Sequence, residues 1–103
     1  MSITCKNDNG TIVVKVTGEI NVLNAGEFEQ DAIFALKNNS CPLTIDFTEL
    51  NYISSSGLSV IIAVAKEVKR QKRKMNIVLA DGFVKDIIHK TGLAPFLEIS
   101  AKS

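Results

Sequence analysis

Three consecutive serines and a glycine, residues 54–57, stand directly in front of an apolar stretch that begins at Leu58. A serine hydroxyl accepts hydrogen bonds from the unsatisfied N–H groups of a first helical turn, and serine is a favoured helix N-cap. A phosphate on such a serine would face the same backbone donors and the positive end of the helix dipole. The residue types alone therefore leave two roles open, helix capping and a phosphorylation switch.

Enzymatic chemistry at these serines is not indicated. The sequence around Ser55 lacks the G-x-S-x-G arrangement of a hydrolase nucleophile, and His89 is the only histidine that could act as a base. Cys5 and Cys41 have no CxxC spacing, so the sequence predicts reduced strand or core cysteines and no metal site. No glycine-rich phosphate loop or dinucleotide fingerprint occurs. We therefore expect a protein that is not an enzyme, has no catalytic residues and binds no cofactor.

Composition narrows the class of partner. The chain has 103 residues, 46% of them hydrophobic and 22% charged, which predicts one packed globular domain. Its net charge of +1 argues against direct nucleic-acid binding. The apolar runs are too short for a membrane span and the first residues do not form a signal peptide, so we expect a cytoplasmic protein. Residues 66–76 hold six of the twelve Lys and Arg residues, and we expect them to form a solvated helix end.

The first half of the sequence predicts a hairpin followed by a helix. Residues 2–6 and 11–18 are strand-like runs separated by NDNG, a tight-turn sequence. Asn24, with Glu27 three residues later, resembles a capping box that opens a helix ending near residues 38–39. The residues expected on its buried face are Phe28, Ala32, Ala35 and Leu36.

The second half alternates strands and helices. A strand is predicted from Pro42 to near Phe47, then a connection, a long helix from near Gly57 to about Arg73, and a strand at 75–80. The buried face of that long helix is expected to contain Leu58, Val60, Ile61, Ile62, Val64, Ala65 and Val68. A short helix follows, with Phe83, Ile87 and Ile88 on its apolar face and Gly92 in the left-handed conformation at its end, before an extended tail at 94–100. The fold class is therefore α/β, with a small mixed β-sheet, an opening hairpin plus parallel strands, covered by helices.

Two motifs, in this order and spacing, resemble a STAS domain of the bacterial anti-sigma factor antagonist type. The first is the TGE turn of residues 17–21, in which a hydrophobic residue and an Asp or Asn follow Glu19. The second, at 46–58, consists of an Asp, a hydrophobic residue and a Ser or Thr, followed by the serines, a glycine and Leu58. The resemblance spans essentially the whole chain and implies a single STAS domain over residues 1–103.

The resemblance implies a partner-switching regulator. In such systems an anti-sigma factor with serine kinase activity binds either a sigma factor or the unphosphorylated antagonist. Phosphorylation of the antagonist ends its binding, and a protein phosphatase restores it. Matched motif to motif, the phosphorylated serine falls on Ser55. The implied partner-binding residues are Glu19, Asn21, Asn24, Ser54, Ser55, Ser56, Gly57 and Leu58. Many phosphorylated members have an acidic residue where this chain has Ser54, and another where it has Asn21.

A second hypothesis from the same resemblance is a STAS scaffold without phosphorylation, such as an accessory subunit of a signalling or lipid-transport complex. In that case the serines only cap the helix or pack. Charge at position 55 separates the two hypotheses, because Ser55→Asp would abolish partner binding only in a switch. The apolar flank at Val60 and Val64 leaves the oligomeric state open between a monomer and a weak homodimer.

Overall fold

The computed structural model describes residues 1–38, 40–92 and 98–101. The element order is β1 (Ser2–Asp8), β2 (Thr11–Ile20), α1 (Ala25–Lys37), β3 (Leu43–Ile53), α2 (Ser55–Arg70), β4 (Met75–Leu79), α3 (Phe83–Lys90) and β5 (Glu98–Ala101). The strands form one five-stranded sheet in the order β1-β2-β3-β4-β5. β1 is antiparallel to β2, and the other neighbouring pairs are parallel. The predicted α/β class and mixed sheet are confirmed.

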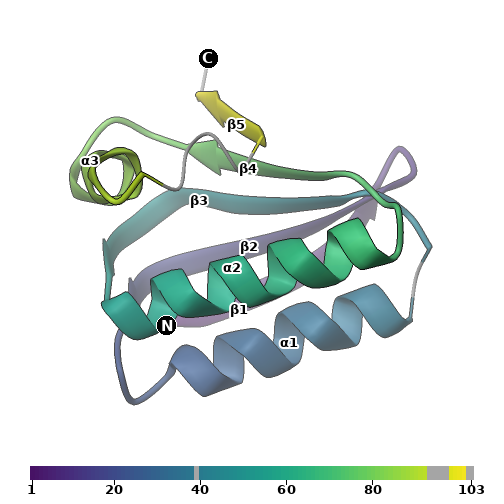
Figure 1. Cartoon of the computed structure of the whole chain (residues 1–103), viewed down its shortest axis with the longest axis horizontal. Coiled ribbons are helices and arrows are strands. Elements are labelled where there is room, and N and C mark those ends of the chain that lie inside the picture. The colour runs from purple at the N-terminus through teal and green to yellow at the C-terminus, as the bar shows by residue number, and fades with distance from the viewer. Residues whose placement is uncertain (39, 93–97, 102–103) are drawn as a thin grey trace.

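The opening hairpin forms as predicted. Asn9 and Gly10 have φ values of 52° and 83°, so both central residues adopt the positive φ that a two-residue hairpin turn requires. The side chain of Asn7 supports the turn by accepting a hydrogen bond from the N–H of Gly10 over 3.1 Å. β1 is thereby folded back along β2 and forms one edge of the sheet (Figure 1).

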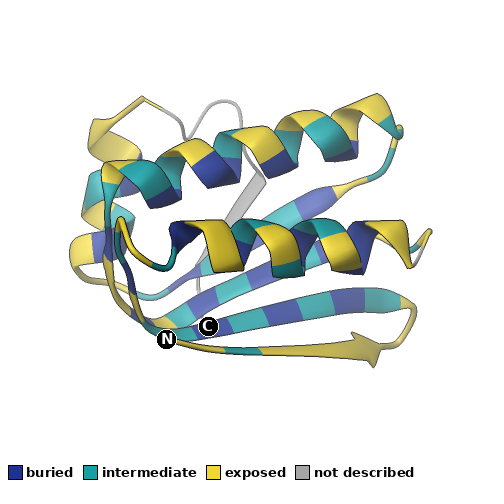
Figure 2. Cartoon of the chain, turned by 90° about the horizontal axis from the view of Figure 1, so that it is seen from below, coloured by how far each residue is buried: buried dark blue, intermediate teal, exposed yellow. Residues whose placement is uncertain are grey.

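Helices α1 and α2 lie side by side across one face of the sheet (Figure 1). Alternate residues of β2, β3 and β4 are buried beneath them, whereas the residues between are half-buried or, toward the ends of β2 and β3, exposed (Figure 2). The four residues predicted for the inner face of α1 are all buried, and Phe28 packs against Phe47 of β3 with ring centroids 5.8 Å apart. Burial of this apolar surface is the main stabilising contribution to the fold.

The buried face of α2 differs partly from the prediction. Val60, Ile61, Val64 and Val68 are buried, but Leu58, Ile62 and Ala65 are only half-buried. The helix therefore faces the core with the side that carries Val60, Ile61, Val64 and Val68, and Leu58 and Ala65 pack at the edge of this face.

The prediction that the third strand ends near Phe47 is wrong. β3 continues to Ile53, so most of the expected connection is strand. Its register with β2 shifts twice, between Lys15 and Thr17 and between Gly18 and Glu19, which means that β3 contains β-bulges. Asp46 stabilises the first bulge by accepting hydrogen bonds from the Thr48 N–H at 2.9 Å and the Thr48 hydroxyl at 2.7 Å. This part of the strand was not predicted, because the bulges break the alternation of apolar and polar residues by which a strand is identified in a sequence.

The boundaries predicted for the long helix are also wrong at both ends. α2 begins at Ser55 rather than near Gly57, and it ends at Arg70 rather than Arg73. Lys72 adopts φ 57°, and the N–H groups of Lys72 and Arg73 donate to the carbonyls of Lys69 and Val68. These two bonds form a Schellman motif, which stops the helix without a glycine.

The last helix, α3, lies beside the end of β3 (Figure 1). Gly92 has φ 77° directly after its C-cap, as predicted, and Ile88 is buried. Phe83, however, was expected on the apolar face and is 46% exposed. The predicted tail strand is confirmed for β5, and its first part, residues 94–97, lies outside the described residues.

Candidate functional site

Ser54 is the N-cap of α2. Its backbone is extended, with φ −85° and ψ 170°, and its hydroxyl accepts a hydrogen bond from the N–H of Gly57 over 3.1 Å. The Ser54 carbonyl accepts from the N–H of Leu58 over 3.0 Å. One of the unsatisfied donors at the helix start is thereby paired, and the Ser54 side chain is half-buried.

Ser55 is the first residue of α2, and it is exposed. Its hydroxyl makes no hydrogen bond within the part of the chain that the structure describes, whereas its carbonyl accepts from the Ser59 hydroxyl over 3.1 Å. Ser56 is half-buried. The Ser56 hydroxyl, like that of Ser55, makes no hydrogen bond among the described residues, so Ser55 differs from its two neighbours in being exposed.

Gly57 lies in the first turn of α2, at its closest approach to the sheet. A Cβ at this position would lie 2.7 Å from Cγ1 of Ile53 and 2.8 Å from Cγ2 of Ile20. Neither distance is a normal carbon contact, so the helix start can pack here only if residue 57 has no side chain. The next residue, Leu58, is half-buried against the core.

The turn between β2 and α1 is held by two asparagines. The Asn21 side-chain oxygen accepts from the N–H groups of Leu23 and Asn24 at 2.9 and 3.1 Å. Asn24 bonds back, accepting from the Asn21 N–H at 2.8 Å and donating its amide to the Glu19 carbonyl at 3.0 Å. The predicted capping box is wrong, because the Asn24 side chain makes no cap hydrogen bond and is used by the turn before it.

Backbone pairing brings the two motifs together. The N–H of Ser54 donates to the carbonyl of Ile20 over 2.9 Å, directly after the paired residues Ile20 and Ile53. The β2–α1 turn and the start of α2 therefore lie side by side at the carboxyl ends of two parallel strands (Figure 1). All eight residues expected to bind a partner lie in or beside these two turns. In an open α/β sheet, this edge is where binding sites are usually found.

Exposed apolar side chains near these turns escaped the sequence analysis. Val22 and Leu23, at the tip of the β2–α1 turn, are 72% and 91% exposed. Tyr52 and Phe83 are also exposed, and their rings stack with centroids 5.5 Å apart and planes 11° apart. The exposure of Val22 and Leu23 could have been predicted from the sequence, because they lie between two turn-forming residues, Asn21 and Asn24. The Tyr52–Phe83 contact joins β3 to α3 and had no sequence signal.

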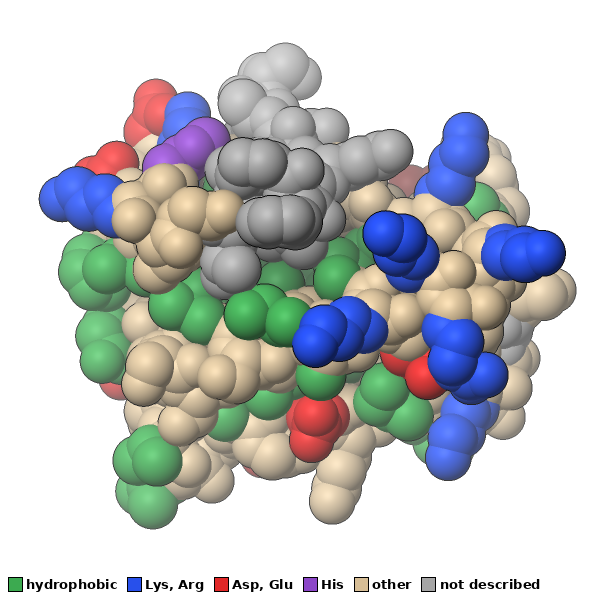
Figure 3. All heavy atoms as spheres, in the orientation of Figure 1, with side chains coloured by type: hydrophobic (Ala, Val, Ile, Leu, Met, Phe, Trp, Pro, Cys, Tyr) green, Lys and Arg blue, Asp and Glu red, His purple; other side chains and the backbone are tan. Residues whose placement is uncertain are grey.

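Charge is distributed unevenly over the molecule. The first turn of α2 contains no acidic residue, while its last turn contains Lys69 and Arg70. Figure 3 shows blue side chains gathered on the right, over the end of α2 and the following loop. The exposed members of the basic stretch are Lys66, Lys69, Arg70, Lys72 and Lys74.

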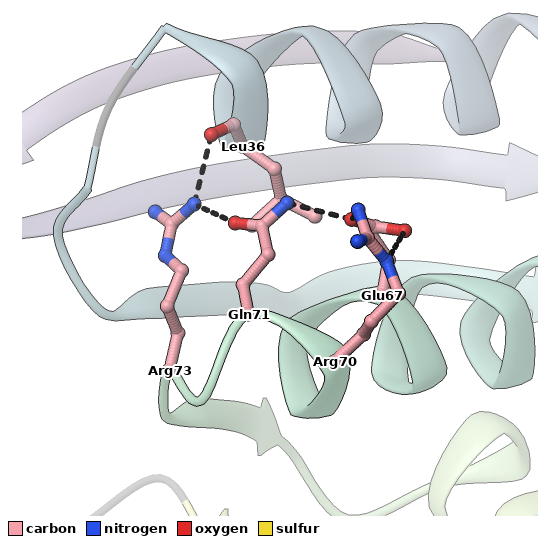
Figure 4. A network of polar contacts seen from close by, with 5 residues as sticks. All are labelled: Leu36, Glu67, Arg70, Gln71 and Arg73. Atoms are coloured by element: carbon pink, nitrogen blue, oxygen red, sulfur yellow. Dashed lines mark hydrogen bonds and ion pairs between the residues drawn. The ribbon is translucent and has the colours of Figure 1, made fainter.

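Arg73 departs from the expectation of a solvated helix end. It is half-buried and donates hydrogen bonds to the Leu36 carbonyl at 2.8 Å, the Cys41 carbonyl at 2.9 Å and the Gln71 side chain at 2.9 Å. Gln71 in turn donates to Glu67 (Figure 4). Arg73 therefore ties the end of α1 and the start of β3 to the loop after α2.

The same network affects one carboxylate. Hydrogen bonds from Arg70 and then from Gln71 hold the pKa of the Glu67 carboxyl below its ordinary value, because they favour its charged form. Glu67 lies far along α2 from Ser55, so this effect concerns the fold rather than the serine turn.

Residues considered for other chemistry have ordinary surroundings. Cys5 is exposed on β1, Cys41 is half-buried and both are free, while His89 is exposed on α3. Desolvation, with a contribution from Asp31, raises the pKa of the Cys5 thiol and so disfavours its reactive thiolate. Among the described residues, no group of three or more His, Cys, Asp or Glu side chains could hold a metal ion. In the same part of the chain, none of the helices has the length and apolarity needed to cross a membrane.

Comparison with known families gives a match over almost the full length. The family model described as "STAS domain" matches residues 2–103. The chain belongs to the STAS domain family. Both motifs of this STAS domain fall within the matched range, and its sheet and helices supply the geometry described above.

Similar proteins carry related names. The anti-sigma-B factor antagonist of Bacillus subtilis is 27% identical over 103 residues, which cover 100% of this STAS domain and 94% of that protein. A crystal structure of an anti-sigma factor antagonist from Mycobacterium paratuberculosis has a TM-score of 0.87 at 25% identity, covering 95% of this chain and 83% of that one. The unphosphorylated form of the anti-sigma factor antagonist SpoIIAA has a TM-score of 0.82 at 14% identity, covering 99% and 89% of the two chains, and shows the same fold.

Proposed function

We propose that this protein is an anti-sigma factor antagonist that works by partner switching. In its unphosphorylated form it binds an anti-sigma factor with serine kinase activity in the cytoplasm, and the sigma factor is released. Phosphorylation of Ser55 by that kinase ends the binding, and a protein phosphatase restores it. The names of the similar proteins support the class of function. The observation that carries the switch is the exposed, unbonded hydroxyl of Ser55 beside the capping hydroxyl of Ser54.

The environment of Ser55 suits a modification that leaves the fold intact. Since Ser54 already caps α2, the Ser55 hydroxyl can be esterified without loss of the cap. A phosphate at the helix start adds about −1.5 to −2 charges near unpaired backbone N–H groups, where the helix dipole favours an anion. The first turn has no acidic side chain to repel it.

The same charge would be unfavourable inside an interface. A phosphate on Ser55 must lose its hydration when a partner covers the turn, and that cost is recovered only if the partner provides a cation. The partner-binding surface proposed here consists of the eight residues in the β2–α1 turn and the start of α2. Binding of the unmodified form has no such cost, because the Ser55 hydroxyl is uncharged.

The test is a binding and phosphorylation assay with purified proteins. Each serine-kinase anti-sigma factor of the source organism would be titrated with the protein by calorimetry, and incubated with it and ATP before intact-mass measurement. We expect one of them to bind the wild type and to add a single phosphate, which Ser55→Ala prevents and Ser59→Ala does not. Ser55→Asp should abolish binding.

Two results would contradict the proposal. Retained binding by Ser55→Asp would favour the scaffold hypothesis, in which charge at this position is unimportant. Phosphate incorporation that persists in Ser55→Ala would place the modification on another residue.

A further inference from the structure

Exposed large hydrophobic side chains are concentrated at the end of the molecule that carries Ser55. Among the described residues there are six, Met1, Val22, Leu23, Phe34, Tyr52 and Phe83. Phe34, near the end of α1, is the exception. Met1 lies beside Gly18 near the end of β2, and the other four lie in or next to the turns of the candidate site. Single exposed apolar residues are common, but a cluster of this kind marks an interaction surface.

Val22 and Leu23 are held rigidly although they are exposed. The backbone on both sides of them is fixed by the four hydrogen bonds of Asn21 and Asn24. A partner that covers these side chains therefore does not have to order the turn, and only the rotamer freedom of the two side chains is lost. Two apolar side chains placed in this way have the properties of anchor residues for a complementary pocket.

Tyr52 and Phe83 form a second apolar surface beside the same turns. Tyr52 pairs in register with Glu19 and lies two residues before Ser54, while Phe83 begins α3. Their stacked rings fix each other, and both remain about half exposed at 41% and 46%. We use the name apolar rim for the surface formed by these four side chains, Val22, Leu23, Tyr52 and Phe83.

We propose that the apolar rim anchors the serine-kinase anti-sigma factor, which carries apolar pockets complementary to it beside the site that receives Ser55. This inference rests on the proposed function and identifies where the binding free energy of that complex arises. The rim adjoins the serine turn through the hydrogen bond between Ser54 and Ile20, so one partner can cover both. The phosphate would then lie among desolvated contacts, where its effect on binding is largest.

The arrangement favours a protein partner over a lipid surface. Anionic membranes attract apolar side chains that are accompanied by Lys and Arg. Here the basic side chains of the loop after α2 gather on the right of Figure 3, away from the left side where α2 begins, and Lys85, two residues after Phe83, is paired with Asp81 over 2.9 Å.

The test compares two matched surface variants. Val22→Thr combined with Leu23→Gln removes half of the rim, and Phe34→Gln removes a 68% exposed apolar side chain at the other end. Calorimetric titration of each with the anti-sigma factor that binds the wild type should show binding at least about 30-fold weaker for the rim variant and unchanged for Phe34→Gln. Both should unfold at the wild-type temperature. Leu23→Gln alone replaces the double variant if the latter is less stable.

The remaining outcomes overturn the inference in distinguishable ways. Affinity of the rim variant within about threefold of wild type, with Ser55→Asp still unable to bind, would refute the rim and leave the proposed function standing. Equal weakening by Phe34→Gln would show that the effect is not local. A wild-type dimer, detected by sedimentation and broken by the rim variant, would assign the rim to self-association. Failure of the wild type to bind any serine-kinase anti-sigma factor would overturn both proposals.

Discussion

Gly57 lies so close to Ile53 that no side chain fits between them, since a Cβ on Gly57 would be 2.7 Å from the Ile53 Cγ1 atom. This approach places the start of α2 directly on the ends of β2 and β3. The glycine of the serine motif is thus a packing requirement, independent of any partner.

Gly57→Ala should therefore destabilise the protein by about 1–3 kcal/mol, the usual cost of overpacking a core. Gly26→Ala is the matched control, because Gly26 also lies in the first turn of a helix but has no atom within 4 Å of its added Cβ. Its effect should be neutral or stabilising by up to about 1 kcal/mol. Urea denaturation of both variants measures the difference, and equal effects would contradict the packing argument.

Ser54 and Ser55 should differ in their contribution to stability. Ser54→Ala removes the N-cap bond to Gly57 and should cost about 1 kcal/mol, whereas Ser55→Ala should change the free energy of unfolding by no more than about 0.5 kcal/mol. Thermal unfolding followed by circular dichroism would show the cap as a fall of about 4–8 °C. A larger loss for Ser55→Ala would mean that the cap has been assigned to the wrong serine.

A phosphate on Ser55, or Ser55→Asp in its place, should leave the fold at least as stable as before. Negative charge at a helix start is favourable by about 0.3–1 kcal/mol. Unfolding temperatures of the two forms at low salt would show this. A clear decrease would imply that phosphorylation acts by unfolding the turn, and loss of partner binding would then need a different explanation.

Arg73→Met should destabilise the fold by about 1–3 kcal/mol, because it leaves the carbonyls of Leu36 and Cys41 without their charged donor. Arg70→Met removes an exposed arginine from the same helix end and should lower the free energy of unfolding at pH 7 by no more than about 0.5 kcal/mol, the usual size of an exposed ion pair on a helix. Partner binding should be retained by both variants once folded, since this network lies at the end of α2, whereas Ser55 is its first residue.

Glu67 should contribute to the pH dependence of stability. Its pKa is lowered in the folded protein, so its stabilising effect is present above the ordinary carboxyl pKa of 4.5 and is lost as the pH falls through the lower folded value. Glu67→Gln should reduce the fall in unfolding temperature between pH 7 and acidic pH.

The sequence was informative at several positions where local chemistry determines structure, although the capping box at Asn24 was wrong. Asn9 and Gly10 predicted the hairpin, helical periodicity predicted the inner face of α1, and Gly92 predicted a left-handed residue. The extension of β3 to Ile53 was missed because its bulges depend on the register with β2. The end of α2 was missed because Lys72 takes a conformation usually adopted by glycine.

For the candidate site, residue types and motif spacing identified the two turns, but they did not identify the structural role of each residue in them. Whether Ser54 or Ser55 caps the helix depends on the backbone angles at position 54, which follow from the pairing of Ser54 with Ile20. The stacking of Tyr52 on Phe83 depends on where α3 packs. Both are tertiary effects that no local pattern contains.

The start of α2 is attached to the sheet at two points, through the Ser54 N–H and the close packing of Gly57, and the Ser54 hydroxyl closes its first turn. We therefore expect a charge on Ser55 to leave this backbone in place. The phosphorylated and unphosphorylated forms would then have the same backbone structure and differ only in the phosphate on Ser55. A partner that distinguishes the two forms must therefore contact the phosphate directly, because the rest of the surface is the same in both.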